Sequence, residues 1–328
     1  KDGDTTLNGF IVYDDAVKGK RPGIVVVHEW WGITAHTRAE ARKFAEQGYT
    51  AFVADMFAGK VADNPTDAGG LAKGLMGNPA GMQARFNAAF AELAKHSTVD
   101  AKRIAGSGYC MGGSVVLNMA RTGADLVGVV AFHAGLGTGT PAAAGKVKAK
   151  VLVLNGADDP LVKPDQIEAF KKEMEAAKVD YRFVNYPGAV HAYTNPEATE
   201  KGKKFNLPLA YNAEVDKQAK SEAAKFLAGT LKKQLLAQPG GGERVESLPL
   251  ALAHLALGFF DRDGLVLAQD ADDGFVAHVG RRRNRDDDSR GPALDGRRRM
   301  LVGSLVEAGV SSGERAGKRT HTGSCSRA

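Results

Sequence analysis

Cysteine is almost absent from this chain. Only two occur in 328 residues, Cys110 and Cys325. Two cysteines cannot form a disulfide framework or a cysteine-based zinc site, and we expect no metal. Long apolar runs are also missing. The longest candidate, residues 248–260, is interrupted by Pro249 and His254, so no segment reaches the length of about 18 residues that a membrane span needs.

A strong charge imbalance is missing as well. The net charge is +6, and its distribution is uneven along the chain. Residues 1–238 hold 23 Lys, 7 Arg and 25 acidic residues, whereas residues 239–328 hold 1 Lys, 13 Arg and 13 acidic residues. The two parts therefore carry +5 and +1, and neither balance is typical of a nucleic-acid binder. We expect no nucleic-acid partner, no membrane, and a monomer or weak homo-oligomer.

The change in composition divides the chain at a Pro/Gly-rich hinge, residues 238–242. We predict a domain over 1–238 and an Arg/Gly-rich extension over 239–328. One interpretation makes the extension a small regulatory or binding module. The other makes it a poorly ordered appendage that is not native to the fold, from coding sequence read past a lost stop or in another frame. The replacement of Lys by Arg favours the second.

Strands alternate with helices through the first domain. We predict strands over 9–13, 23–28, 49–54, 103–106, 126–132, 151–154 and 181–186, and helices over 37–47, 67–75, 82–96, 114–121, 165–177 and 214–236. This alternation predicts the α/β class, with a mostly parallel sheet covered by helices on both faces. Chemistry in such sheets gathers at the carboxyl ends of the strands.

A glycine-rich turn joins the fourth predicted strand to its helix. Its pattern Gly108-x-Cys110-x-Gly112 resembles a nucleophile elbow, with Cys where Ser is commoner. Such a turn forces its middle residue into a strained backbone, and side chains two positions either way would clash. The middle side chain then stands at the first turn of a helix, where the dipole favours a thiolate over a thiol.

Two other interpretations of this turn stay open. Gly-rich strand-to-helix turns also hold phosphates, but the spacing here is not G-x-G-x-x-G and no Lys-Ser/Thr pair follows to make a P-loop. A buried Cys110 could also be a small core hydrophobe.

A thiol nucleophile needs a base and a carboxylate that orients the base. His191 follows the strand 181–186, and Asp158 and Asp159 follow the strand 151–154, in the chain order of α/β-hydrolases. The Gly-x-x-Asp-x-x-Val pattern favours Asp159 as the acid, with Asp158 left as the alternative. His28 and His133 also end strands, and we interpret both as structural residues of the sheet edge.

The loop after the strand 23–28 completes the set. Such a loop supplies one oxyanion N–H and the residue after the nucleophile supplies the other, which predicts the backbone N–H groups of Trp30 and Met111. Glu29 beside them has two open interpretations. It accepts the S–H proton of Cys110, or it is a solvated loop charge.

Four motifs together are similar to the dienelactone hydrolase family. They are the segments 27–32 (VHEWWG), 106–113 (GSGYCMGG), 156–162 (GADDPLV) and 188–193 (GAVHAY). The resemblance covers about residues 5–236 and none of the extension. It implies an α/β-hydrolase fold and no cofactor.

The resemblance also implies a catalytic triad of Cys110, His191 and Asp159. Cys110 would rest largely protonated against Glu29 until substrate disturbs the pair. The thiolate, stabilised by His191, would then attack a small carboxylic ester or lactone and form a thioester that water hydrolyses.

One position departs from the family pattern. The family carries an Arg four residues after the catalytic His, where it helps to hold the substrate's carboxylate, and this chain has Asn195 there. Arg85 or Arg38 are the candidate replacements. We therefore expect small-ester hydrolysis rather than activity on dienelactone itself.

An aromatic mouth is the remaining expectation, built from Trp30, Trp31, Tyr109 and Tyr193 and suited to small acyl groups. Two rival functions stay open: a broad aryl or polyester esterase at the same site, and a non-catalytic binding protein of hydrolase fold. We expect a cytoplasmic protein, or a periplasmic or secreted one if a leader is removed before Lys1.

Overall fold

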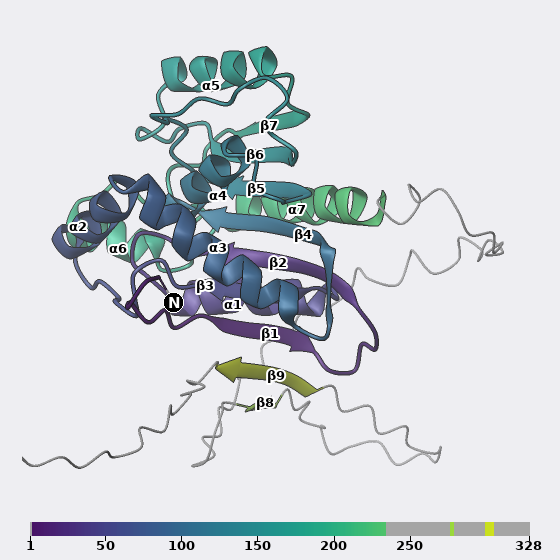
Figure 1. Cartoon of the computed structure of the whole chain (residues 1–328). Helices are drawn as coiled ribbons and strands as arrows, with labels where there is room; N and C mark the ends of the chain where they lie inside the picture. Colours follow the sequence, from purple (N-terminus) through teal and green to yellow (C-terminus); the bar gives the residue numbers. More distant parts are fainter. Residues whose placement is uncertain (1, 234–275, 279–298, 305–328) are drawn as a thin grey trace, which may run out of the picture.

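A single β-sheet organises the part of the chain that the computed structural model describes, which is residues 2–233, 276–278 and 299–304. Its first seven strands are β1 Phe10–Asp14, β2 Arg21–Val27, β3 Thr50–Ala54, β4 Val99–Tyr109, β5 Gly128–Phe132, β6 Lys150–Gly156 and β7 Tyr181–Tyr186. The strand order is β7-β6-β5-β4-β2-β3-β1-β9-β8. Strands β2 to β7 run parallel, and β1 pairs antiparallel with β3 (Figure 1).

Two short strands beyond residue 238 extend the sheet past β1. Strand β9, Arg299–Ser304, pairs antiparallel with β1, and β8, Val276–His278, pairs antiparallel with β9. No strand was predicted for either segment. The rest of the predicted extension lies outside the described residues.

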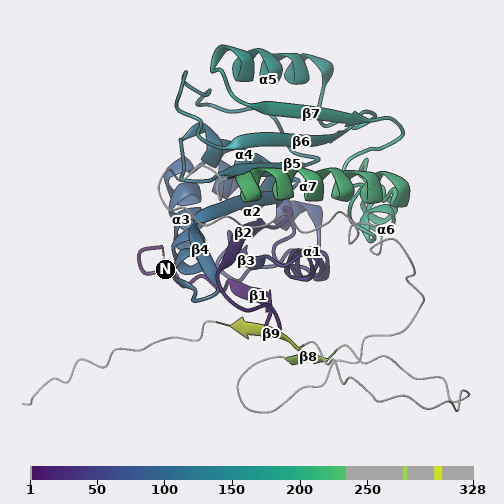
Figure 2. The same ribbon diagram turned by 90° about the vertical axis from the view of Figure 1, so that its right-hand side faces the viewer.

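Helices cover both faces of the sheet. They are α1 Ala35–Glu46, α2 Pro65–Met76, α3 Pro79–Lys95, α4 Met111–Arg121, α5 Pro164–Ala176, α6 Ala198–Phe205 and α7 Ala213–Lys233. Figures 1 and 2 show α1 and α7 on one face and α3, α4 and α5 on the other. Within the described residues no helix is both long and apolar enough to cross a membrane.

Local sequence sets where several helices begin. Asn64 and Asn78 cap α2 and α3, each accepting a backbone N–H, and Pro follows each Asn at the first helical position. Helix α4 begins at Met111, three residues earlier than predicted. Helix α6 was not predicted at all. Its eight residues are mostly polar, with only Ala198 and Gly202 buried, so it lacks a long apolar period.

The hydrophobic core has two layers because β2 and its neighbours are buried on both faces. Val25 and Val27 face the layer under α3, α4 and α5, while Ile24 and Val26 face the layer under α1 and α7. This explains why the run 24–27 is apolar without alternation. The doubly covered sheet holds the carboxyl ends of its parallel strands rigidly at one edge.

Candidate active site

Cys110 occupies the sharp turn between β4 and α4. Its backbone has φ 54° and ψ −118°, a region that L-residues rarely adopt. A Cβ added at Gly108 would lie 2.1 Å from the carbonyl oxygen of Gly112, and one added at Gly112 would lie 2.3 Å from that of Val27. Both positions therefore require glycine. The turn has the geometry of a nucleophile elbow, with the half-buried Cys110 directly before the first helical residue.

Three side chains from separate loops meet at this turn. The His191 Nε2 lies 3.0 Å from the Cys110 Sγ, and the His191 Nδ1 lies 2.7 Å from the Asp159 Oδ2. Asp159 is buried, and its Oδ1 accepts the N–H of Leu161, so the carboxylate is held from both sides. Asp158 instead is exposed and accepts the N–H of Gly188. The geometry puts Asp159, not Asp158, beside the imidazole.

The charge state of His191 follows from its two neighbours. Burial lowers the pKa of this imidazole, but the negative charge of the Cys110 sulfur and the hydrogen bonds to Asp159 and Cys110 outweigh burial and raise it to about 10. A protonated His191 donates one N–H to the sulfur and the other to the carboxylate. The arrangement therefore favours a protonated His191 held between the sulfur and a buried acid.

Glu29 has a different partner from the one the resemblance implied. Its Oε2 accepts a hydrogen bond of 2.6 Å from the Asn195 Nδ2, and both side chains are buried. Cys110 meanwhile bonds to His191. The interpretation of Glu29 as a solvated loop charge is wrong, because only 1% of the residue is exposed.

The two backbone N–H groups predicted for the oxyanion, those of Trp30 and Met111, have no acceptor among the described residues. Met111 is the first residue of α4, so its N–H has no acceptor within the helix. The Trp30 N–H makes no hydrogen bond to another residue of the described chain. The two loops touch, because Gly112 packs against the carbonyl oxygens of Val27 and His28.

The four predicted mouth residues divide into two pairs. Trp30 is half-buried and lies against the largely buried Trp31, with ring centroids 4.9 Å apart. The two tyrosines lie in the core instead. Tyr109 is stacked on Phe132 and Tyr193 donates its hydroxyl to the Leu154 carbonyl oxygen. Neither tyrosine is more than 1% exposed and Trp31 is 3% exposed, so of the four residues only Trp30 keeps appreciable exposed surface.

The two candidate cations for a substrate carboxylate are engaged elsewhere. Arg85 donates to the Asp2 carboxylate and to the Met56 carbonyl oxygen. Arg38 lies over the Phe10 ring, with its guanidinium carbon 4.6 Å from the centroid. In the described part of the chain, Glu29 forms no salt bridge.

We predicted only a structural role for His133 and did not single out Thr194. His133 is fully buried, its Nδ1 accepts the Cys110 N–H at 3.1 Å, and its Nε2 lies 2.8 Å from the Thr194 Oγ1. The sequence did place His133 at a strand end, which was the available signal. No sequence signal marked Thr194, which lies three residues after His191.

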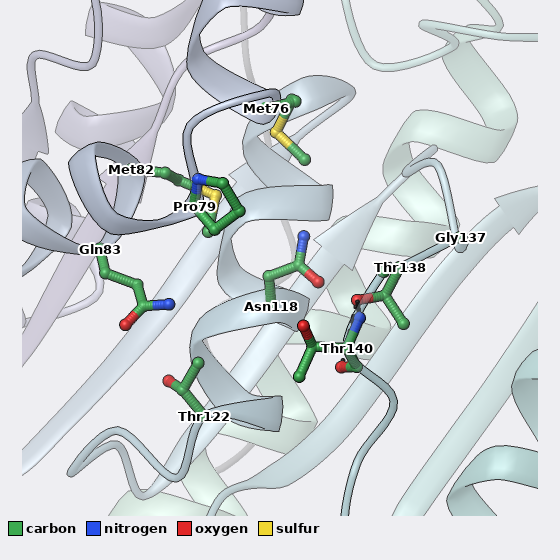
Figure 3. A pocket seen from close by; sticks show the side chains of 10 residues that line it. Met76, Pro79, Met82, Gln83, Asn118, Thr122, Gly137, Thr138 and Thr140 are labelled. Carbon is green, nitrogen blue, oxygen red and sulfur yellow. Dashed lines mark hydrogen bonds between the residues drawn. The ribbon is translucent and has the colours of Figure 1, made fainter.

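A separate cavity of about 350 Å³ lies beside α4, away from the triad. Figure 3 shows its walls, which come from the ends of α2 and α3, from α4 and from the loop 137–140. Its lining contains no charged residue and none of the three triad side chains. Among the described residues, no cluster of His, Cys, Asp and Glu could hold a metal ion.

Several known proteins resemble this chain over more than half of its length. The model of the Dienelactone hydrolase family matches residues 7–231. Protein usf of Aquifex pyrophilus is 30% identical over 198 residues, covering 59% of this chain and 86% of that protein. A putative carboxymethylenebutenolidase of Aquifex aeolicus is 27% identical over 178 residues, covering 53% of this chain and 77% of that protein.

Solved structures agree with these matches. The dienelactone hydrolase-like promiscuous phosphotriesterase P91, from metagenomic libraries, is 33% identical, with a TM-score of 0.66 over 70% of this chain and 95% of that one. The structure named m3DLH is 35% identical, with a TM-score of 0.67 over 70% and 95%. The α/β-hydrolase fold predicted from the sequence is confirmed, and the chain belongs to the dienelactone hydrolase family.

Proposed function

We propose that this chain hydrolyses small carboxylic esters or lactones with Cys110 as nucleophile, His191 as acid and base, and Asp159 as the group that orients the imidazole. The family supports ester or lactone hydrolysis as the reaction class. The observation that carries the finer assignment is the continuous contact from sulfur to imidazole to carboxylate, 3.0 Å and then 2.7 Å. These are the distances that nucleophile activation needs.

The reaction divides into two halves. In the first, the Cys110 thiolate attacks the carbonyl carbon, the oxyanion binds the N–H groups of Trp30 and Met111, and the C–O bond breaks. The leaving alcohol or enol takes its proton from His191, which leaves a thioester on the sulfur. In the second, His191 removes a proton from water, which attacks the thioester. The C–S bond of the tetrahedral intermediate then breaks and the carboxylic acid product departs, while His191 keeps the proton taken from water, which restores the thiolate–imidazolium pair.

We infer that uncharged substrates are preferred. The Glu29 carboxylate is buried beside the oxyanion loop, its described partner is the neutral amide of Asn195, and Arg85 and Arg38 are engaged elsewhere. A substrate carboxylate would meet a buried negative charge without a described cation to offset it, and unpaired buried charge is costly. Dienelactone, which carries a carboxylate, should therefore be a poor substrate.

The same experiment can detect two other activities. The similarity to P91, over 95% of that chain, supports phosphotriester cleavage as a second candidate. Broad aryl or polyester hydrolysis would use the same nucleophile.

The experiment is turnover of p-nitrophenyl acetate, neutral lactones and a neutral phosphotriester by the wild type and by Cys110→Ala. We expect the wild type to cleave the acetate and the variant to lose that activity. Turnover that survives the substitution would reject Cys110. A folded wild type without turnover on any substrate would favour a non-catalytic binding protein.

A further inference from the structure

A network of buried polar side chains begins at the backbone of Cys110 and ends at Tyr109, the residue before it. It starts at the Cys110 N–H, which donates to the Phe132 carbonyl oxygen at 3.0 Å and to the His133 Nδ1 at 3.1 Å. The His133 Nε2 in turn lies 2.8 Å from the Thr194 Oγ1. The Thr194 Oγ1 is 3.4 Å from the His36 Nε2, whose ring faces Glu40 at 3.9 Å. Glu40 makes the next contact of the network.

Glu40 connects this hydrogen-bond network, the circuit, back to the nucleophile turn through Tyr109. Its Oε2 accepts the hydroxyl of Tyr109, the residue before Cys110, at 3.0 Å. Its other oxygen lies 2.9 Å from the Nζ of both Lys43 and Lys220. Burial raises the pKa of Glu40, but these cations and His36 outweigh burial and lower it. A charged Glu40 therefore anchors the far side of the circuit.

The hydrogen bonds favour one tautomer of His133. The Cys110 N–H is shared between the Phe132 carbonyl oxygen at 3.0 Å and the His133 Nδ1 at 3.1 Å, and the second bond favours the proton on Nε2, which then donates to the Thr194 hydroxyl. The ring stays neutral. Burial lowers the His133 pKa well below the ordinary value, and the positive charges of His191 and His36 lower it further, which outweighs the opposing effect of a backbone hydrogen bond. A neutral imidazole thus stands next to the His191 ring, with centroids 5.3 Å apart.

The position of Thr194 links the nucleophile turn to the loop that carries His191. It lies three residues after His191 on the loop that follows β7, whereas His133 follows β5 and Cys110 follows β4. The bond between His133 and Thr194 is therefore a direct tie between the nucleophile turn and the loop that carries the base. Such ties decide whether reacting groups stay in register, since a displacement of about 1 Å can cost about 100-fold in rate.

We propose that His133 and Thr194 are positioning residues that hold the His191 loop at hydrogen-bonding distance from the Cys110 sulfur. The inference rests on the proposed nucleophile. It goes beyond the triad because neither residue touches the sulfur or the substrate. Their role is to keep the thiolate–imidazolium pair formed.

Thr194→Val and His133→Asn test this proposal in a Cys325→Ser background, so that Cys110 is the one cysteine. Valine keeps the shape of threonine and removes the hydroxyl. Asparagine tolerates the left-handed backbone of His133, φ 38°, and can place an oxygen near the Cys110 N–H, but it is too short to reach Thr194. Both changes therefore break the same bond.

Each variant should lower kcat about tenfold and leave KM within about twofold. Each should slow Cys110 alkylation by iodoacetamide at pH 7, followed by intact mass, about tenfold. Thr194→Ser should restore both rates to within about threefold of wild type. The double variant should be little worse than either single one, because one shared link is lost.

Thr50→Val is the matched control. Thr50 is also fully buried, and its hydroxyl bonds to the Thr98 Oγ1 at 2.7 Å, but it lies at the amino end of β3, the opposite edge of the sheet. Both Thr50→Val and Thr194→Val remove a buried hydroxyl and should lower Tm. Thr50→Val should leave kcat and the alkylation rate unchanged.

Wild-type kcat and alkylation in a folded Thr194→Val variant would overturn the proposal, as would equal losses in Thr50→Val. The alkylation rate needs no substrate. If the wild type turns over no ester while Thr194→Val still slows alkylation, the proposed function fails and the positioning role stands.

Discussion

The Nε2 of His191 lies 3.0 Å from the Sγ of Cys110, although 81 positions separate the two residues in the chain. Sheet register brings them together. Tyr109 at the end of β4 is level with Phe132 of β5, Phe132 is level with Leu154 of β6, and Gly156 at the end of β6 is level with Tyr186. Three loops therefore leave the sheet at one edge.

Asp159→Asn should reduce kcat/KM for p-nitrophenyl acetate by about 10³-fold or more, because an amide neither orients nor stabilises the imidazolium as a carboxylate does. Asp158→Asn should change it less than threefold, since Asp158 is exposed and contacts the Gly188 N–H. Steady-state kinetics of both variants checks this. A larger loss in Asp158→Asn would reverse the assignment.

The pH dependence of kcat/KM should have its basic limb near pH 10. The folded pKa of His191 is raised to about 10, so the imidazolium persists below that pH and is lost as pH rises through it. Titration of acid released from ethyl butyrate measures the limb without a chromogenic ester. Asp159→Asn should move the limb to lower pH, and a wild-type limb near pH 7 would contradict the ion pair.

Glu29→Gln should raise activity on anionic esters relative to neutral ones. The substitution removes a buried negative charge and leaves a side chain that can still bond to Asn195. We expect the ratio of kcat/KM for mono-p-nitrophenyl succinate to that for p-nitrophenyl acetate to rise about tenfold. An unchanged ratio would show that Glu29 does not select substrate charge.

Gly108→Ala should destabilise the protein by at least about 3 kcal/mol, because its Cβ would fall 2.1 Å from a backbone oxygen that cannot move freely. Gly74→Ala is the control: it lies within α2 with nothing within 4 Å of the added Cβ. That change should stabilise by about 0.5–1 kcal/mol. Urea unfolding of both variants measures the difference, and a stable, active Gly108→Ala would refute the tight turn.

Acid should destabilise the fold partly through His28. Burial lowers its pKa to about 4, and its ring links the Glu29 carbonyl oxygen to the Met56 N–H. Between pH 6.5 and 4 the unfolded chain binds a proton that the native chain does not, so the free energy of unfolding falls by about 3 kcal/mol as pH falls. Urea unfolding at pH 7 and pH 4 should show a smaller fall in the free energy of unfolding for His28→Gln than for the wild type.

Much of the site could be predicted because its residues sit at strand ends with recognisable spacing. The glycines beside Cys110, the Gly-x-x-Asp loop and His191 are local signals, and their order along the chain was informative. Helix α6 escaped prediction because its face is mostly polar. The side-chain partners also escaped prediction, since Glu29 and Asn195 are 166 positions apart.

The sequence by itself determined the alternation of buried strands and helices, and with it the glycines that Cys110 requires at its turn. These depend on short-range sterics and on side-chain periodicity, which neighbouring residues specify. Tertiary structure alone decided that Asp159 rather than Asp158 meets His191, that Glu29 bonds to Asn195, and that Tyr109 is buried. Those outcomes depend on where whole loops and strand ends come to lie, because hydrogen-bond partners are chosen by distance in space and not by position in the chain.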